Sequence, residues 1–171
     1  VFPNAAPGLR RSLSAASRSP AAQALLRRAS AVLELDLEQL WAAGPDSKFD
    51  ETRHCQPSVY VASVVAVERL REERPEVVER CQAVAGIGVG EYAALHAAGV
   101  FSFELGLRLV QARAEAMHLA ASAGEQQQLA LTGVELERAR VLCEEARRGA
   151  GGGEEVCSVA CAVAPKAQIC A

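Results

Sequence analysis

The decapeptide GIGVGEYAAL, residues 86–95, decides the fold of this chain. It follows a short apolar run that ends at Ala85, and it leads into an alanine-rich stretch with good helix propensity. Three glycines at alternate positions allow the backbone to turn sharply between the two segments. We therefore predict a buried strand over residues 81–85, a tight turn, and a helix over residues 90–98.

A strand–turn–helix unit with this glycine spacing is typical of a nucleophile elbow, G-x-S-x-G. In that motif the small flanking residues let the chain bend and present a serine hydroxyl at the start of the helix. The central position here is Gly88, so the turn has kept its frame without the hydroxyl. The backbone N–H of Val89, the next residue, can still donate to an oxyanion.

The same glycines raise a second interpretation, a dinucleotide-binding loop. The fingerprint G-x-G-x-x-G/A requires a small residue at position 91, where this chain has Glu91. A carboxylate there would repel a pyrophosphate at the helix N-terminus. Glu91 is better explained as a favourable negative charge in the first helical turn, so nucleotide binding is disfavoured.

Helix and strand signals alternate along the chain and predict an α/β fold. Pro20, Pro57 and Ser102 each mark an expected helix start. We expect a hydrolase-like core of parallel strands with helices on both faces, formed by residues 1–123.

A second domain is expected over residues 124–171. Leu129–Thr132 has the pattern of a strand, residues 134–148 that of a helix, and residues 156–163 that of a further strand. The glycine run between the helix and the last strand predicts a loop.

The composition is that of a globular protein and excludes several classes of function. Hydrophobic residues make up 50% of the 171 positions, enough to bury a core. The formal net charge of −3 is too close to neutral to favour binding to nucleic acid or to an anionic membrane surface. No apolar run approaches the roughly 20 residues that a membrane-spanning helix needs.

The six cysteines lie at irregular spacings, without a C-x-x-C pair or a neighbouring histidine pair that would indicate a zinc site. A chain this long and aliphatic does not need a disulfide scaffold. We predict buried free thiols in a reducing compartment. Cys81 lies in the strand expected before the elbow, and burial there argues against it as a substitute nucleophile.

The first 33 residues contain no acidic side chain, while five arginines alternate with serine and alanine. Such a composition is typical of organellar transit peptides. An exposed basic helix face is the alternative, and the composition leaves both interpretations open.

Three further segments accompany the elbow: HCQP at residues 54–57, VAS at residues 61–63 and RAEAM at residues 113–117. Together with GEYAAL after the turn, they resemble the malonyl-CoA:acyl carrier protein transacylases, especially the mitochondrial type. The resemblance is strongest from His54 to Met117. It implies an acyltransferase core followed by a small ferredoxin-like subdomain, in family members that are substantially longer than this chain.

The resemblance also implies a chemistry, covalent acyl transfer in fatty-acid biosynthesis. The family's elbow serine takes the malonyl group from malonyl-CoA as an ester and passes it to the thiol of acyl carrier protein, with a distant histidine as general base. Malonyl-CoA and acyl carrier protein are therefore the implied partners. No cofactor and no metal ion are implied, the base is expected beyond residue 171, and the implied location is the mitochondrial matrix.

The resemblance assigns the candidate site residue by residue. Gly88 stands at the nucleophile position and Val89 at that of the backbone oxyanion donor. Gln56 falls where a residue faces the family's active site, and Arg113 falls where an arginine pairs with the malonyl carboxylate. Ala5 stands in place of an oxyanion-binding glutamine. The alternative for Arg113 is an exposed helix arginine.

His54, His96 and His118 are interpreted as structural, because none has an evident nucleophilic partner. His54, two residues from Gln56, is the hardest to dismiss. We therefore predict a fragment or degenerate homologue of a malonyltransferase that does not turn over. The alternatives are a non-catalytic scaffold that binds acyl carrier protein, and a module that holds malonyl-CoA through Arg113 without reacting.

Overall fold

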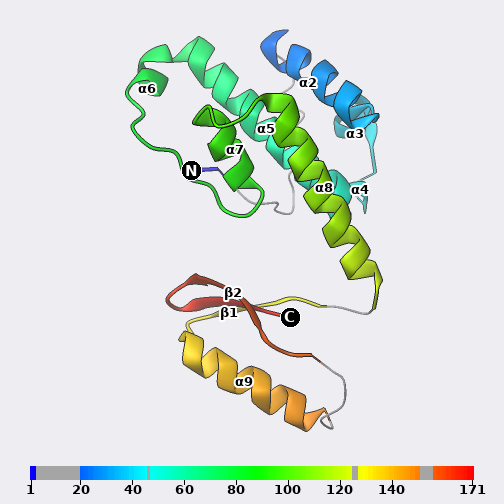
Figure 1. Cartoon of the computed structure of the whole chain (residues 1–171), viewed down its shortest axis with the longest axis vertical. Helices are drawn as coiled ribbons and strands as arrows, with labels where there is room; N and C mark the ends of the chain where they lie inside the picture. Colours follow the sequence, from blue (N-terminus) through cyan, green and yellow to red (C-terminus); the bar gives the residue numbers. More distant parts are fainter. Residues whose placement is uncertain (3–19, 46, 125–126, 151–155) are drawn as a thin grey trace. The chain divides into compact units, whose positions relative to one another are not determined.

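Helices and strands combine in the computed structural model, which describes residues 1–2, 20–45, 47–124, 127–150 and 156–171. The chain is of the predicted α/β class. It divides into two compact units, Val1–Ala120 and Ala121–Ala171 (Figure 1). Ala5 and the first three arginines of the basic N-terminal segment lie outside the described residues.

The first unit is helical and is organised around α5 (Thr52–Glu73). Helices that pack against it include α2 (Pro20–Leu33) and α7 (Gly90–Ala97). Helix α8 (Phe103–Ser122) meets α5 through Tyr60, whose ring stacks on Phe103 with centroids 5.8 Å apart. The shorter helices are α3 (Leu37–Ala43), α4 (Ser47–Asp50) and α6 (Pro75–Glu79).

The core of this unit contains large apolar side chains whose few polar atoms are paired. Trp41 is 1% exposed and its Nε1 donates to Ser58 Oγ at 3.2 Å. The hydroxyl of the buried Tyr60 donates to the carbonyl of Phe103 at 3.1 Å. These bonds remove the penalty of burying unpaired donors, so both rings can contribute their full apolar area to the core.

Arginine also joins the helices at the surface. Arg28 Nη2 lies 2.6 Å from Glu104 Oε1, and its guanidinium stacks over the ring of Phe103 at 5.3 Å from the centroid. This part of the basic N-terminal segment is therefore the exposed face of α2, held onto α8.

Two of the three predicted helix starts are confirmed, and one is wrong. Helix α2 begins at Pro20, and α8 follows Ser102, whose Oγ accepts the N–H of Leu105 at 3.2 Å. The helix expected to begin at Pro57 begins at Thr52 and contains the proline. Most residues from Cys55 to Val65 are buried, and this packing outweighs the one hydrogen bond that proline removes.

The prediction of a buried strand over residues 81–85 is also wrong, because this segment is exposed. Its pairing is a single parallel bridge between Phe2 and Gly86, in which the N–H of Phe2 donates to Ala85 O at 2.8 Å. A parallel strand is buried only when helices cover both faces and strands flank both edges, and the described residues supply no further strand here. Cys81, expected to be buried, is exposed for the same reason.

The second unit is a small sheet with one helix. Its elements are β1 (Leu129–Thr132), α9 (Leu136–Gly149), β2 (Val159–Ala164) and β3 (Ala167–Cys170). The strand order is β1-β3-β2, and both pairs are antiparallel. Strands β1 and β2 are thus parallel to each other, joined by α9, with β3 inserted between them as in a split β-α-β unit.

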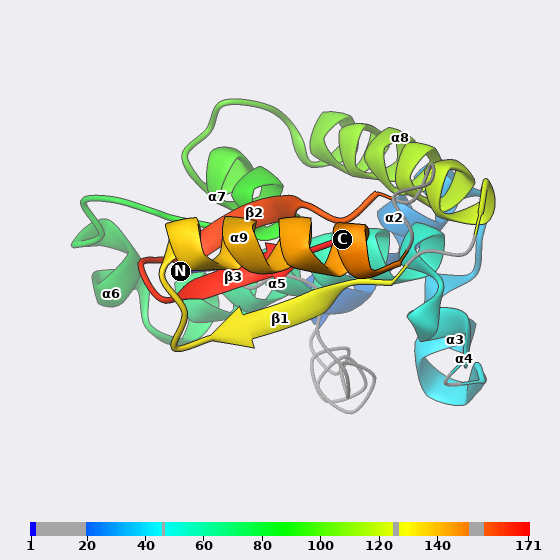
Figure 2. The same ribbon diagram turned by 90° about the horizontal axis from the view of Figure 1, so that it is seen from below.

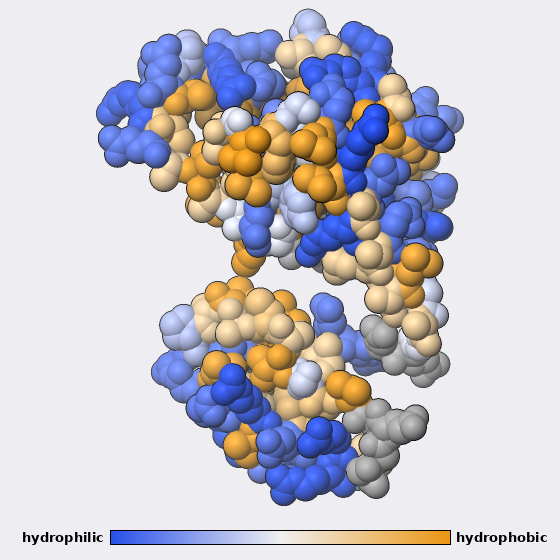
Figure 3. All heavy atoms as spheres, in the orientation of Figure 1, coloured by the Kyte–Doolittle hydropathy of each residue, from blue (hydrophilic) through white to orange (hydrophobic). Residues whose placement is uncertain are grey.

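Helix α9 covers one face of this sheet by packing against β2 and β3 (Figure 2). Ala139 and Cys143 of the helix are buried, as are Gln168 and Cys170 of β3. Figure 3 shows apolar residues over the strands and hydrophilic residues over the outer side of α9. Strand β3, the central strand, had no clear signal in the sequence.

Among the described residues, no helix has both the length and the apolar content that crossing a bilayer would require.

Candidate functional site

The turn between the exposed segment and α7 has the tight geometry expected of an elbow. Gly88 adopts φ 57°, in the left-handed region that favours glycine. The N–H of Gly90 donates to Ile87 O at 3.0 Å and begins the helix. A Cβ atom at Gly86 would lie 2.2 Å from the carbonyl carbon and oxygen of Gly90, so backbone packs directly on backbone and only glycine fits at position 86.

Glu91 binds back onto this turn. Its Oε1 accepts the N–H of Gly88 at 3.0 Å, and its own N–H donates to Gly88 O at 3.2 Å. This reciprocal pairing across three residues is of the capping-box kind, in which an acidic side chain satisfies an amide just before the helix. The interpretation of Glu91 as a favourable charge therefore missed a direct hydrogen bond to the nucleophile position.

Val89 links the elbow to the core. It caps α7 with φ −63° and ψ −26°, and its side chain is fully buried. The burial of this side chain fixes the backbone of the turn, and with it the amide that the sequence assigns as oxyanion donor. At position 88 itself there is no side-chain oxygen that could act as a nucleophile, because the residue is glycine.

The structure brings the two other candidate residues together. Arg113 Nη1, on α8, donates to Gln56 Oε1, on α5. Gln56 is 3% exposed, and its Nε2 faces Thr52 Oγ1 at 2.7 Å and Met117 Sδ at 3.2 Å. The amide of Gln56 is therefore held on both ends, and it orients the guanidinium through its oxygen.

Thr52 and Met117 are the partners that the sequence reasoning missed. Each lies four residues from a candidate residue on the same helix, Thr52 before Gln56 and Met117 after Arg113. Residues four apart share a helix face, so this spacing is the signal that would have identified them.

The elbow and the Arg113–Gln56 pair adjoin one hydrophobic core. Val89 belongs to the same cluster of buried side chains as Cys55 and Val110, which precede Gln56 and Arg113 on their helices. Among the described residues, no acidic side chain forms an ion pair with Arg113. A guanidinium in this setting, with one nitrogen held by an amide, can receive a carboxylate.

Two of the three histidines have structural roles. Nδ1 of His96 lies 3.0 Å from Phe101 O, and its ring meets Tyr60 edge-on. His54 Nε2 lies 3.7 Å from Glu51 Oε2; burial lowers the pKa of His54, and the Glu51 carboxylate opposes that shift. Within the described ranges, no three side chains of His, Cys, Asp or Glu are arranged to hold a metal ion.

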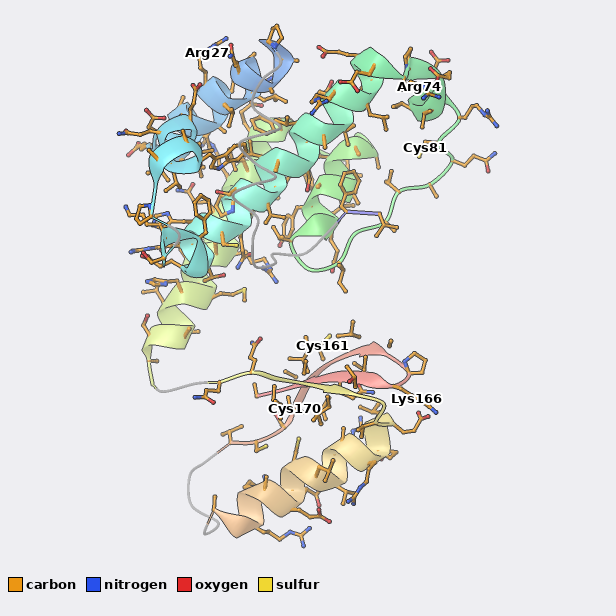
Figure 4. The ribbon with its side chains drawn as sticks, turned by 180° about the vertical axis from the view of Figure 1, so that it is seen from behind. Arg27, Arg74, Cys81, Cys161, Lys166 and Cys170 are labelled. Atoms are coloured by element: carbon orange, nitrogen blue, oxygen red, sulfur yellow. The ribbon has the colours of Figure 1, made fainter. Side chains whose placement is uncertain are left out.

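A separate apolar groove of about 1080 Å³ lies in the first unit, away from these residues. It runs between α5, α6 and the exposed segment before the elbow, and Val59, Leu70 and Val84 are among its lining residues. Cys81, which is labelled in Figure 4, also lines it. None of Gly88, Val89, Gln56 or Arg113 does, so the groove is distinct from the candidate site.

No protein-family model matches the chain. Curated relatives do: the mitochondrial malonyl-CoA-acyl carrier protein transacylases of Mus musculus and Homo sapiens are each 41% identical to it over 143 residues, 82% of its length. A probable mitochondrial enzyme of the same name from Drosophila melanogaster is 45% identical over 103 residues. The match covers 38% and 37% of the first two proteins, so the chain spans less than half the length of these relatives.

Solved structures agree with these relatives. The acyl-carrier-protein S-malonyltransferase of Burkholderia pseudomallei 1710b superimposes with a TM-score of 0.82 at 28% identity, covering 99% of this chain and 52% of that one. A malonyl-transacylase solved in complex with the acyl carrier protein of a type II polyketide synthase gives a TM-score of 0.78 at 27% identity, with coverage of 99% and 52%.

Proposed function

This chain belongs to the malonyl-CoA:acyl carrier protein transacylase family, and we propose that it is a homologue that no longer forms the acyl-enzyme. The observation that carries the proposal is Gly88 at the turn of the elbow, with φ 57° and no side chain to acylate. Loss of a serine nucleophile lowers kcat by a factor on the order of 10⁶. Here the loss also removes the covalent route, because the elbow offers no other atom for the malonyl ester.

The remaining site supports binding of the substrate's carboxylate. Arg113, oriented by the buried amide of Gln56, would hold the malonyl carboxylate through two parallel N–H groups. The amide of Val89 would lie against the thioester oxygen. These residues orient malonyl-CoA, while the step that would break its thioester has no nucleophile.

The covalent step can be tested with radiolabelled malonyl-CoA. The six cysteines are first blocked with N-ethylmaleimide, so that any remaining label reports an ester. We expect no protein-bound label on this chain, with a full-length mitochondrial relative as the positive control. Hydroxylamine-sensitive label on the thiol-blocked chain would overturn the proposal.

The Gly88→Ser variant extends the test by restoring the hydroxyl alone. We expect at most a trace of label on this variant, because a serine without a paired base is a weak nucleophile. His54 and His96 are each held by groups of their own surroundings. Labelling of the variant at the rate of the positive control would show that a base is already in place.

A second candidate function is binding without reaction, and the intact Arg113–Gln56 pair favours it. Isothermal titration calorimetry would compare malonyl-CoA with acetyl-CoA, which lacks the carboxylate. We expect malonyl-CoA to bind about tenfold more tightly, the effect of roughly 1.4 kcal/mol from a charge-assisted contact. Arg113→Ala should abolish this difference, whereas Arg108→Ala, an exposed arginine of the same helix, should preserve it.

Acyl carrier protein is the proposed macromolecular partner, and the mitochondrial matrix is the proposed location. The first follows from the complex in which a related transacylase is bound to such a carrier. The second is supported by the mitochondrial relatives and by the basic, acid-free composition of the N-terminal segment. Protease protection in isolated mitochondria and a pull-down with the organelle's carrier protein would test them separately.

A further inference from the structure

The second unit brings three cysteines from three different segments onto one face. Cys143 lies on α9, Cys157 precedes β2, and Cys170 is the last residue of β3. All six cysteines of the chain are free. Cys143 and Cys170 are each 5% exposed, while Cys157 is only half-buried. The prediction of buried thiols therefore holds for some of the cysteines and not for others.

The strand register places Cys157 and Cys170 on the same face of the sheet. Val159 is directly opposite Cys170, and the pairing continues outward, since Ser158 N–H donates to Ala171 O at 2.7 Å and receives the return bond at 3.0 Å. Directly opposite residues share a face, and so do residues two apart on one strand. Cys157, two residues before Val159, is thus on the face of Cys170.

This is the face that α9 covers. Cys143 lies four residues after Ala139, and these are the two fully buried residues of the helix. The Cys143 thiol lies near the thiols of both Cys157 and Cys170, because each of them influences its pKa. Cys170 lies on the α9 side of the sheet and Cys161 on the opposite side (Figure 4).

Cys143 is therefore a neighbour of both other cysteines. The backbone at Cys170 and the backbone at Cys157 are held to different degrees. Cys170 belongs to the central strand, paired on both edges, whereas Cys157 lies outside the regular strand. A disulfide needs its two Cα atoms within about 7 Å and a particular torsion about the sulfur–sulfur bond. The backbone at Cys157 can adjust to that geometry more easily than the backbone of β3.

We propose that Cys143 and Cys157 are the site of an oxidative cross-link that ties α9 to the start of β2, a modification independent of malonyl chemistry. With hydrogen peroxide as oxidant, the more accessible Cys157 sulfur takes one oxygen atom, forming a sulfenic acid and one water. The Cys143 sulfur then attacks the Cys157 sulfur, the S–O bond breaks, and a second water leaves. The two thiols lose two electrons and two protons in total, and the peroxide is reduced to water.

Cross-link mapping by mass spectrometry can test this pairing. Trypsin releases Cys143 in residues 141–147, Cys157 in residues 149–166 and Cys170 in residues 167–171. Because the second peptide also contains Cys161, the assay uses the Cys161→Ser variant as its background. Cys161 is exposed on the uncovered face, so this change leaves the cluster intact. Burial raises the pKa of Cys143 and of Cys157, so peroxide is added at about pH 9.

We expect a non-reduced product that joins residues 141–147 to residues 149–166 and is lighter by two hydrogens. It should form at least about tenfold faster in the folded chain than in urea, because folding aligns the two sulfurs. Cys157→Ser, at a half-buried position that tolerates change, should abolish it, and Cys170→Ala should retain it. A predominant link to residues 167–171, a product that survives Cys157→Ser, or equal rates with and without urea would each overturn the proposal.

Discussion

The elbow and the Arg113–Gln56 pair adjoin one hydrophobic core, but they hold their shape by different means. At the elbow, the positive φ of Gly88 and the close approach at Gly86 shape the turn, and the side chains of Val89 and Glu91 support it while position 88 contributes none. In the pair, the side chain of Gln56 is itself the link between α5 and α8.

This difference explains why one chemical group can be absent while the other is present in a folded chain. Glycine is the residue best suited to φ 57°, so the absence of a side chain at position 88 carries no structural penalty. The loss of Gln56 would remove the side-chain partner that Arg113 and Thr52 share at half-buried positions.

The largest effect should come from a methyl group placed inside the elbow. Gly86→Ala would put Cβ 2.2 Å from two backbone atoms of Gly90, which cannot move without displacing α7. We expect the free energy of unfolding to fall by about 3 kcal/mol, the upper range for overpacking. Urea denaturation followed by far-UV circular dichroism would measure it.

Gly124→Ala is the matched control, because a Cβ there would meet no atom within 4 Å. Its unfolding free energy should change by less than about 0.5 kcal/mol. Equal losses for the two variants would mean that the turn yields, and that the close backbone approach at Gly86 does not define the elbow.

Removal of the Gln56 amide should have the next largest effect. Gln56→Ala removes the acceptor of a half-buried charged guanidinium, and we expect a loss of about 2 kcal/mol in unfolding free energy. Fluorescence of Trp41, the single tryptophan, which lies in the same core, would report it during urea denaturation. Gln23→Ala, at an exposed position of α2, should be nearly neutral. A neutral Gln56→Ala would show that the pair is not structural.

A side chain at the nucleophile position should have a smaller cost. In Gly88→Ala and in Gly88→Ser, a non-glycine residue must adopt the left-handed conformation, at about 1 kcal/mol of unfolding free energy. The alanine variant isolates the strain, and the serine variant adds the hydroxyl. If thermal denaturation shows that both variants are as stable as the unmodified chain, the claim that the elbow favours glycine is contradicted.

The smallest effect should be a pH dependence from His54. Its pKa is lowered in the folded chain, because burial disfavours the charged form. The unfolded chain therefore binds the proton more readily, and stability should fall as the pH drops below about 6.5, the ordinary histidine value. In the His54→Gln variant, the melting temperature should depend less on pH between about pH 6.5 and pH 5.

The Glu51 carboxyl titrates at lower pH than His54, so its protonation does not interfere with this measurement. A hydrogen bond from Arg53 lowers the pKa of the Glu51 carboxyl, so its contribution is present above about pH 4.5 and is lost below it. An unchanged slope between pH 6.5 and pH 5 in the His54→Gln variant would exclude His54 as the titrating group.

Local signals in the sequence predicted a good part of this structure. Pro20 and Ser102 mark helix starts because capping acts within one turn, and residues 129–132 form a strand as their alternation indicates. Pro57 misled the prediction, because the burial of the surrounding residues carries the helix through a proline. Strand β3 escaped prediction because a four-residue strand in the centre of a sheet owes its existence to its two partners.

By itself, the sequence determined the elbow frame, the absence of its hydroxyl and the family resemblance, because glycine spacing and motif order are properties of neighbouring residues. The tertiary structure alone decided that Arg113 meets Gln56 across 57 positions, that residues 81–85 are exposed, and that Cys143 lies near Cys157 and Cys170. Each of these depends on which distant segments pack together. Register and helix packing are collective properties of the fold, and no local pattern encodes them.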